Sequence, residues 1–432
     1  MLGEMSTPET RAPTVNWAGN HAYPAERLHR PAGMAELQEI VSRSASVHAL
    51  GSRHSFNGIA DAADLISLEL LHTDQALPAA VVLDPDGQSV SFGGGVKYGE
   101  LAERLHDEGL ALHNMASLPH ISVAGAVATA THGSGVGNGN LATAVSALEI
   151  VTSGGEIVRT RRGDPDFDGM VVGLGALGVV TRVTLDVEPA FDVRQQVFQD
   201  MGWEVFLENV DEILSCGYSV SVFTLFGDTV DMVWVKSRTD RSEPLEGDLF
   251  GARPAVVDLH PVIGLDPTPC TPQRGKPGPW YDRLPHFRMG FTPSAGEELQ
   301  SEYLLPRRHA AAAIEAVRAL GNRIRPLLMT CEIRTVAADR LWLSTSYGRD
   351  SVALHFTWVR DEGAVEELLV DLEAALEPFG ARPHWGKVFV AEAVAIAPRY
   401  EGHADFLRLA QRLDPRGAFR NDWLETRVLG RR

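Results

Sequence analysis

The chain has 432 residues, a formal net charge of -18 at pH 7 and 44% hydrophobic residues. This length exceeds what one hydrophobic core usually supports, so we expect two domains or more. The negative charge argues against nucleic acid and anionic membranes as partners, because both would repel the molecule.

Cysteine usage and the first residues indicate a reducing compartment. Cys216, Cys270 and Cys331 are scattered and show neither disulfide nor metal spacing. No apolar run approaches the roughly 20 residues that span a bilayer, and residues 1–20 lack the apolar centre of a signal peptide. We therefore predict a cytoplasmic protein with no metal site.

The N-terminal third predicts an α+β unit that ends near Pro189. Its apolar spacing predicts helices over 31–44 and 99–109 and strands over 81–93, around a turn at 84–87, and over 144–158 and 179–187.

Within this unit, a turn of mostly small residues follows the apolar run 47–50. It reads Gly51-Ser52-Arg53-His54-Ser55. Glycine and serine let a backbone approach a ligand closely, and a neutral imidazole has a free nitrogen near pH 7. A lone histidine in a turn is more often solvated or capping, so a ligand role for His54 needs support from elsewhere.

That support comes from residues 117–135, SLPHISVAGAVATATHGSG, where almost every side chain after Val123 is small. The exposed backbone N–H groups of such a run can cradle a pyrophosphate without a lysine. The alternative is a Gly/Ala-rich helix-packing segment or loop.

Gly173, Gly175 and Gly178 match the G-x-G-x-x-G spacing of dinucleotide-binding folds. That fingerprint requires a helix directly after the glycines and an acidic residue about twenty positions later. Residues 179–187 are β-branched and predict a strand instead, so we predict no NAD site here.

The second half begins with strand-like alternation over 220–235. Residues 244–293 then hold ten of the 25 prolines. A connection of this length predicts a lid or binding loop rather than a plain linker. Strand and helix alternation returns over 326–379.

Two strands of this region carry polar residues on one face. The period of two places together Thr330, Glu332, Arg334, His355 and Thr357. It places on the opposite face Met329, Cys331, Ile333, Leu354, Phe356 and Trp358. An ordinary sheet with one solvated face is the alternative, but acid, base and hydroxyl groups combined at low charge density favour a polar cavity.

The turn at His54 and the run 117–135 together resemble the vanillyl-alcohol-oxidase (PCMH-type) flavoprotein family. Further motifs make the chain similar, over nearly its whole length, to the alditol and aldonolactone oxidase branch, and most closely to bacterial alditol oxidases: Gly173–Thr181, Glu332-Ile333-Arg334, His355-Phe356-Thr357 and His384-Trp385-Gly386-Lys387. The resemblance implies a two-domain α+β fold. Its expected parts are a PCMH-type FAD-binding domain over 1–190, a substrate-binding cap over 191–400 and a C-terminal return to the FAD domain over 401–432.

The resemblance also implies how FAD is held. In this family the histidine of the turn, here His54, carries the 8α-methyl of the flavin covalently. The other expected FAD contacts are Ala49, Leu50, Gly51, Ser52, Arg53, Ser55, Ser117, Ser122, Gly125, Thr129, Ala130, Thr131, His132, Val180 and His384. Members with two covalent bonds carry a cysteine within the segment corresponding to 113–132, and none stands there in this chain. We therefore expect attachment through His54 alone.

The resemblance assigns polyol contacts to Ser117, Glu332, Arg334, Thr357 and Lys387, with His355 close to the reacting carbon. The expected reaction moves a hydride from a terminal primary alcohol to flavin N5, giving an aldose and, with dioxygen, hydrogen peroxide. Arg334 and Lys387 suit stabilisation of the alcohol oxygen, and Glu332 is expected to orient Arg334. Spacing does not decide whether Lys387 or His355 is the base.

Two further functions stay open. One is a sugar-1,4-lactone oxidase or dehydrogenase of the same fold; the other is a non-catalytic flavin-binding protein or an NADPH-dependent flavin reductase. Ala116 stands where the family places a small residue at the flavin edge that affects oxygen access, which favours an oxidase. The sequence leaves open the preferred polyol, the turnover, the electron acceptor and the oligomeric state, for which we expect a monomer.

Overall fold

The computed structural model describes residues 15–71, 82–84, 87–291 and 297–430, and within them the chain forms an α+β fold with four β-sheets. The N-terminal half holds three of them: a parallel sheet of β1 (Arg27–His29), β3 (Asp64–Ile66) and β2 (Val47–Ala49); an antiparallel sheet of β4 (Val82–Leu83), β5 (Ser89–Gly93), β9 (Val179–Asp186), β7 (Val145–Val151) and β8 (Ile157–Arg161); and the pair of β6 (Leu110–Ala111) and β10 (Glu188–Pro189).

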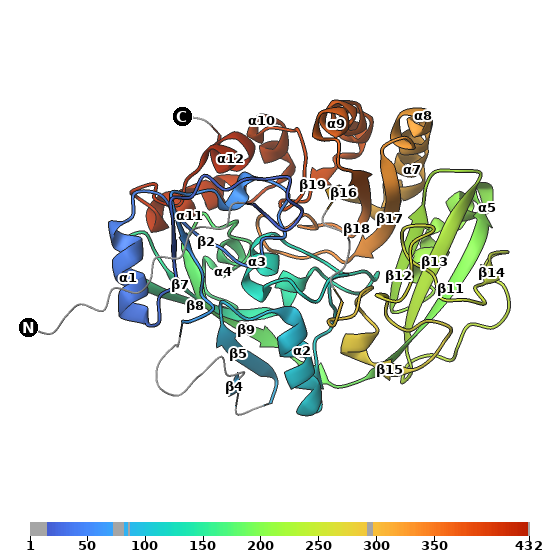
Figure 1. The fold of residues 1–432 in the computed structure, drawn as a ribbon, viewed down its shortest axis with the longest axis horizontal. Coiled ribbons are helices and arrows are strands. Elements are labelled where there is room, and N and C mark those ends of the chain that lie inside the picture. The colour runs from blue at the N-terminus through green and yellow to red at the C-terminus, as the bar shows by residue number, and fades with distance from the viewer. Residues whose placement is uncertain (1–14, 72–81, 85–86, 292–296, 431–432) are drawn as a thin grey trace, which may run out of the picture.

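The fourth sheet is antiparallel and fills the other half of the molecule (Figure 1). Its strands, in spatial order, are β14 (Arg253–Pro254), β11 (Asp192–Gly202), β13 (Thr229–Arg238), β12 (Ser219–Thr224), β17 (Leu328–Val336), β18 (Ser351–Val359), β16 (Glu298–Pro306) and β19 (Arg382–Pro383), and β15 (Gly278–Pro279) pairs with β11. In Figure 1, β16, β17 and β18 lie nearer to the N-terminal half than β11 and β14 do.

The helices follow from local apolar spacing. Helix α1 buries Leu37 and Val41, four residues apart, and has Glu36 in its first turn and Arg43 in its last, as the helix dipole favours. The N-terminal half contains α1 (Met34–Arg43), α2 (Tyr98–Asp107), α3 (Val123–Ala128) and α4 (Phe167–Met170). The remaining helices are α5 (Trp203–Glu208), α6 (Val210–Ser215), α7 (Ala310–Ala319), α8 (Gly321–Ile324), α9 (Glu362–Leu376), α10 (Ala393–Ile396), α11 (His403–Leu413) and α12 (Asp422–Leu424).

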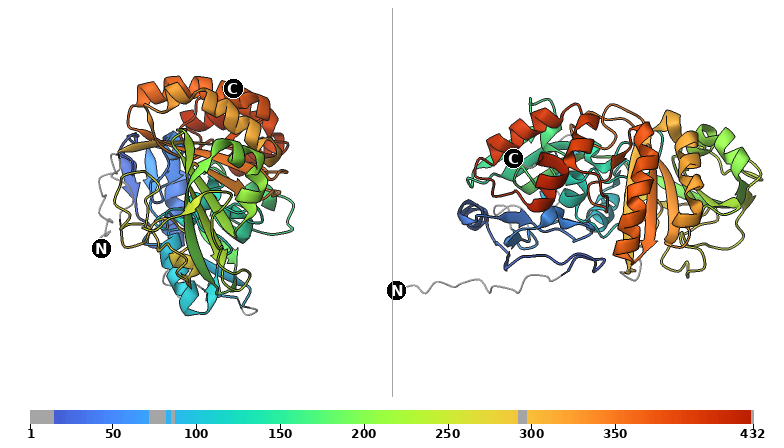
Figure 2. Two further views of the ribbon diagram at one scale, coloured as in Figure 1. Left: turned by 90° about the vertical axis from the view of Figure 1, so that its right-hand side faces the viewer. Right: turned by 90° about the horizontal axis from the view of Figure 1, so that it is seen from above.

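Helices α7 and α9 pack together and cover one face of the large sheet (Figure 2). The hydroxyl of Tyr303 on β16 donates to Glu373 of α9 at 2.8 Å, so α9 lies on the face to which Tyr303 points. Because side chains alternate along a strand, Glu302 points to the opposite face.

The C-terminal helices α10, α11 and α12 lie over the N-terminal half (Figure 1). The Val47 amide of β2 donates to the Ala418 carbonyl at 2.8 Å, and the Asn421 side chain donates to three carbonyls around residues 58–61. The end of the described chain therefore supports the strand that leads into the turn at His54. None of the described helices is long and apolar enough to cross a bilayer.

The predicted helices and the strand over 179–187 are present, but two predicted strands are wrong in extent. Residues 144–158 form β7 and β8 joined by a turn in which Gly155 has φ +80°, and 220–235 forms β12 and β13 joined by a turn in which Phe226 has φ +55°. Each turn breaks a run of strand-forming residues into a hairpin. Residues 81, 85, 86, 292 and 293 of the predicted elements lie outside the described residues.

Candidate active site

A cavity of about 930 Å³ is lined by residues of both halves of the molecule. Except for Ala130, every predicted site residue lines it: Ala49, Leu50, Gly51, Ser52, Arg53, His54, Ser55, Ser117, Ser122, Gly125, Thr129, Thr131, His132, Val180, Glu332, Arg334, His355, Thr357, His384 and Lys387. The fold thus gathers residues from widely separated parts of the chain around one space.

Ala130 is the exception. It is completely buried, and its φ of +53° is unusual for a residue with a side chain. Its amide donates to the Val127 carbonyl at 3.2 Å. Thr129 and Thr131 on either side line the cavity, so Ala130 shapes the backbone there but does not line the space.

The two N-terminal motifs meet directly. The Ser122 amide donates to the Ser52 hydroxyl at 3.0 Å, and a Cβ on Gly51 would lie 2.3 Å from the Ser122 hydroxyl oxygen. Only glycine permits this approach, so the position of Gly51 in the turn has a steric cause. α3 begins directly after Ser122.

His54 lies where these motifs meet the cavity. Both ring nitrogens are buried without a hydrogen-bond partner among the described residues. The ring stacks on that of Trp17, with 5.1 Å between the ring centroids. Burial lowers the pKa of His54 to about 4, and the positive charge of Lys387 adds to the effect. The imidazole is therefore neutral near pH 7, and its free nitrogens fit a bound group that bonds to one of them.

Leu174, Gly175 and Gly178, in the glycine-rich turn, have positive φ values. Strand β9 follows them directly, as predicted, instead of the helix that a dinucleotide fingerprint requires. The turn lines the same cavity with Gly173, Leu174, Gly175, Leu177 and Gly178.

The opposite wall of the cavity consists of polar side chains from β16, β17 and β18. β17 contributes Thr330, Glu332 and Arg334, and β18 contributes His355 and Thr357, all of them buried. This is the predicted polar face. Met329 also lines the cavity, although the period of two places it on the opposite face, because the register between β17 and β18 shifts between Leu328 and Thr330.

Sequence reasoning missed the third strand of this wall. β16 contributes Glu298, Gln300 and Glu302, which alternate with Leu299 and Ser301. The same period-two rule applied to 298–302 would have placed these three polar side chains on one face.

Glu302 is the centre of the wall. Its Oε1 lies 2.7 Å from Arg334 Nη2 and 3.1 Å from His132 Nε2, and its Oε2 accepts from His355 Nδ1 at 3.2 Å. Burial raises the pKa of Glu302, but His132, Arg334 and His355 outweigh it and hold the pKa well below its usual range. The carboxylate is therefore ionised, and its nearest contacts to Arg334 and His355 fix both side chains.

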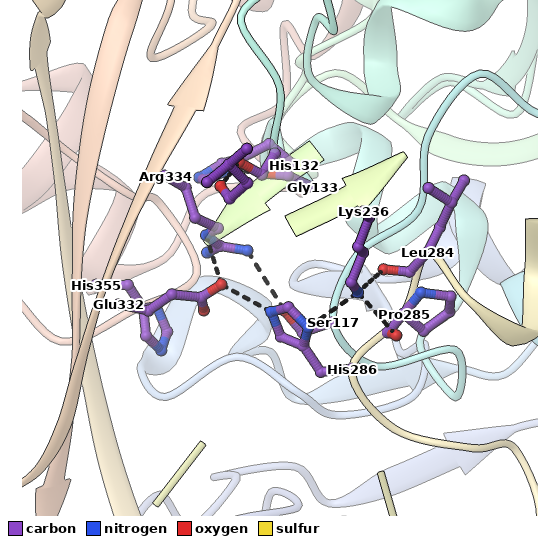
Figure 3. A network of polar contacts seen from close by, with 12 residues as sticks. Ser117, His132, Gly133, Lys236, Leu284, Pro285, His286, Glu332, Arg334 and His355 are labelled. Atoms are coloured by element: carbon purple, nitrogen blue, oxygen red, sulfur yellow. Dashed lines mark hydrogen bonds and ion pairs between the residues drawn. The ribbon is translucent and has the colours of Figure 1, made fainter. Parts of the chain in front are cut away.

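Glu302, rather than Glu332, makes the short contact with Arg334. The Glu332 carboxylate lies 3.6 Å from Arg334 Nε, and it accepts instead from His286 Nε2 at 2.7 Å (Figure 3). The expected orienting role of Glu332 thus belongs mainly to Glu302. Arg334 also reaches the Ser117 hydroxyl at 3.4 Å.

The two candidate bases, His355 and Lys387, differ in their protonation state near pH 7. Burial lowers the pKa of His355, so its ring is neutral near pH 7, with Nδ1–H on Glu302 and Nε2 3.5 Å from the Thr357 hydroxyl. Lys387 donates to the Gln300 side chain; burial lowers its pKa to about 8, and Arg334 adds to the effect. At pH 7 the wall therefore contains the Arg334 cation beside the neutral His355 ring, and Lys387, which follows β19 and lines the same cavity, adds a second cation.

The proline-rich segment closes one side of the cavity, with His260, Pro261, Val262, Leu265, His286 and Phe287 among the lining residues. The amides of His286 and Phe287 donate to the Ser117 carbonyl at 3.1 and 3.2 Å. Within the described ranges, no group of three or more His, Cys, Asp or Glu side chains is arranged to hold a metal ion.

Comparison with known proteins identifies the family. Residues 25–161 match the FAD binding domain family, and residues 296–427 match the D-arabinono-1,4-lactone oxidase family. An alditol oxidase of Streptomyces sp. (strain IKD472 / FERM P-14339) is 52% identical over 413 residues, covering 95% of this chain and 97% of that protein. The chain belongs to the alditol oxidase family. Both the family and the FAD-binding domain were predicted from the sequence.

More distant relatives also match nearly the whole chain. The L-gulono-1,4-lactone dehydrogenase of Mycobacterium tuberculosis (strain ATCC 25618 / H37Rv) is 31% identical over 441 residues, covering 96% of this chain and 98% of that protein. The crystal structure of cholesterol oxidase from B. sterolicum aligns with a TM-score of 0.74 at 13% identity, covering 97% of this chain and 99% of that chain, which shows the fold alone. The chain is an FAD-dependent oxidoreductase.

Proposed function

We propose that this protein is an alditol oxidase that oxidises the terminal primary alcohol of a linear polyol, such as xylitol or sorbitol, to the aldose, with dioxygen reduced to hydrogen peroxide. The observation that carries the proposal is the buried wall of β16, β17 and β18, where the Arg334 cation, carboxylates and a neutral imidazole line one cavity together with the nearby Lys387. The 52% identical alditol oxidase supports the same reaction.

The proposal assigns residues 1–190 to FAD, 191–400 to the substrate and 401–432 to a return onto the FAD-binding part. FAD, when bound, takes a hydride from the alcohol carbon and passes two electrons to dioxygen. The cradle would be the predicted residues that line the cavity from 49–55, 117–132, Val180 and His384, and the unpartnered nitrogens of His54 support a single covalent 8α-histidyl attachment.

The substrate hydroxyl that reacts would lie between His355 and the two cations. Neutral His355 would accept the hydroxyl proton at Nε2, since Glu302 holds the opposite nitrogen as a donor. Arg334 and Lys387 would stabilise the negative charge left on the oxygen, and their fixed hydrogen bonds mean that little reorganisation is needed. This favours His355 over Lys387 as the base.

The other hydroxyls would be bound by Ser117, Glu332 and Thr357. A buried site that offers several hydrogen-bonding groups penalises ligands without matching hydroxyls, because its own groups are then left unpaired. Short aliphatic alcohols should therefore be poor substrates.

An aldonolactone oxidase or dehydrogenase is the second candidate, favoured by the match of residues 296–427 and by the 31% identical lactone dehydrogenase. A peroxide assay with xylitol, sorbitol, ethanol and galactono-1,4-lactone separates the two. We expect kcat/KM to be highest for an open-chain polyol. A clear preference for the lactone supports the second candidate, and dependence on added NAD contradicts both.

We further propose that the protein acts as a cytoplasmic monomer on small molecules and dioxygen, without nucleic acid or membrane partners. Three free thiols and the net charge of -18 support this setting. Light scattering coupled to size-exclusion chromatography measures the mass, and a dimer would contradict the proposed monomer.

A further inference from the structure

Lys236, one of only four lysines in the chain, is buried on β13, in the same sheet and on the same face as Glu332 of β17. Its ammonium group donates to the carbonyls of Leu284 and Pro285 at 2.5 and 3.0 Å and to His286 Nδ1 at 3.1 Å (Figure 3). None of the ion pairs found among the described residues includes Lys236. A buried lysine without a carboxylate partner is costly, so its position needs a reason.

The contact with Lys236 decides the protonation of His286. Burial lowers the pKa of Lys236 to about 7. In its ammonium form the group has three donors and no acceptor, which matches its three neighbours, the two carbonyls and Nδ1 of His286. In that form Nδ1 accepts, and the ring proton is on Nε2. That proton is donated to Glu332 Oε1 at 2.7 Å. Burial lowers the pKa of His286 to about 4, and Lys236 adds to the effect, so the ring stays neutral.

The position of His286 is fixed from other directions as well. Its ring packs edge-on against Trp234 and Phe223 at 5.3 and 5.5 Å between ring centroids. The backbone of His286 and Phe287 binds the Ser117 carbonyl. One short stretch of the proline-rich segment thus contacts two proposed substrate residues, Ser117 through its backbone and Glu332 through its side chain.

We propose that Lys236 and His286 are positioning residues that fix the Glu332 carboxylate for substrate hydroxyls. His286 occupies Oε1 of Glu332 with a proton that Lys236 keeps on Nε2, which leaves the remaining acceptor positions of the carboxylate for the polyol. The proposal rests on the proposed function, because Glu332 serves this role only if hydroxyl groups bind beside it.

The decisive substitution is Lys236→Met, which keeps the unbranched shape and most of the length of the side chain and removes the donor. Its matched control is Lys276→Met, which changes an exposed lysine of the proline-rich segment. We expect kcat/KM for xylitol to fall about 10- to 100-fold in Lys236→Met, mainly through KM, since a buried hydrogen-bonded group loses its partner. The control should match the wild type.

A second pair of variants covers the case in which Lys236→Met does not fold. His286→Gln can accept from Lys236 and donate to Glu332, whereas His286→Leu can do neither. We expect His286→Gln to retain most of the xylitol affinity and His286→Leu to lose it. Equal KM values in the two variants, or a Lys236→Met enzyme that matches Lys276→Met, would overturn the proposal.

Nitrogen NMR of the histidine side chains gives a readout that needs no turnover. We expect His286, assigned by its absence in His286→Gln, to be a neutral ring with the proton on Nε2 in the wild type and to lose that fixed state in Lys236→Met. A wild-type ring with the proton on Nδ1 would overturn the positioning proposal. A wild-type enzyme that does not oxidise polyols would contradict the proposed function instead, so the two failures are distinct.

Discussion

The two walls of the cavity differ in how far apart their residues lie in the sequence. The wall around His54 comes from two short stretches, 49–55 and 117–132, which meet where Ser122 binds Ser52. The opposite wall takes alternate residues from three strands and joins them through Glu302. A wall of this second kind depends on each member, because loss of one partner leaves another buried polar group unpaired. We therefore expect substitutions there to have larger effects than substitutions in the wall around His54.

Arg334→Ala should give the largest effect, because it removes a cation that Glu302 and Ser117 hold in place. We expect the rate of anaerobic FAD reduction by xylitol, measured by stopped flow, to fall roughly 10²- to 10³-fold, or about 2.7–4 kcal/mol, as when one preorganised donor is removed. Arg340→Ala is the control, since that side chain is 90% exposed. A reduction rate equal to the control would eliminate Arg334 from the proposed chemistry.

The same difference between the walls explains what could be predicted from sequence. Residues 49–55 form a local motif whose small side chains and histidine are adjacent in the chain, and their resemblance to a flavoprotein family was sufficient to place them. Glu302 and His286 come from separate segments, and nothing near them in sequence shows that they meet Arg334 or Glu332. Only the pairing of β16 with β18 and the path of the proline-rich segment bring them there.

Local geometry also limits prediction within single strands. Met329 faces the cavity because of a shift in strand register that no residue pattern indicates. Glu302, by contrast, stands in an alternating stretch, so its face was predictable although its partners were not.

The pH profile tests the protonation of Lys387, which lies beside the wall formed by β16, β17 and β18. A lysine whose pKa is lowered to about 8 is mostly cationic at pH 7 and neutral above pH 8. If the cation stabilises the alcohol oxygen, kcat/KM should fall about tenfold per pH unit above pH 8. If neutral Lys387 were the base, kcat/KM would instead rise through this range. Lys387→Arg should remove the alkaline fall, since arginine stays protonated.

An acid limb should accompany this fall. Burial lowers the pKa of His355, so the ring becomes protonated, and loses its proton-accepting nitrogen, only below its ordinary value of 6.5. We expect kcat/KM to decrease on acidification below that value, and the decrease should be absent from a His355→Gln enzyme with residual activity. A kcat/KM that stays constant throughout the acidic range in which the wild-type enzyme remains folded would contradict His355 as the base.

His54→Ala should have a smaller effect on rate, because the backbone contacts around Ser122 do not depend on the imidazole. We expect wild-type protein precipitated by acid to stay yellow and the His54→Ala protein to release its colour. Oxidation should slow by less than in Arg334→Ala, and the melting temperature should change little. Release of intact FAD from the acid-precipitated wild type would contradict covalent attachment.

Thr357→Ala should have the smallest effect, although Thr357 belongs to the wall formed by β16, β17 and β18. Its hydroxyl lies at the far end of the Glu302–His355 contact, 3.5 Å from His355 Nε2, and this long separation contributes little to fixing the ring. Loss of the Thr357 hydroxyl removes one neutral hydrogen bond to the substrate, worth about 0.5–1.5 kcal/mol. We therefore expect KM for xylitol to rise roughly two- to tenfold with kcat nearly unchanged. Thr357→Ser keeps the hydroxyl and should preserve KM. If Thr357→Ala lowers kcat as much as Arg334→Ala does, then the hydroxyl orients His355, and the distance of a residue from Glu302 does not determine its importance to this wall.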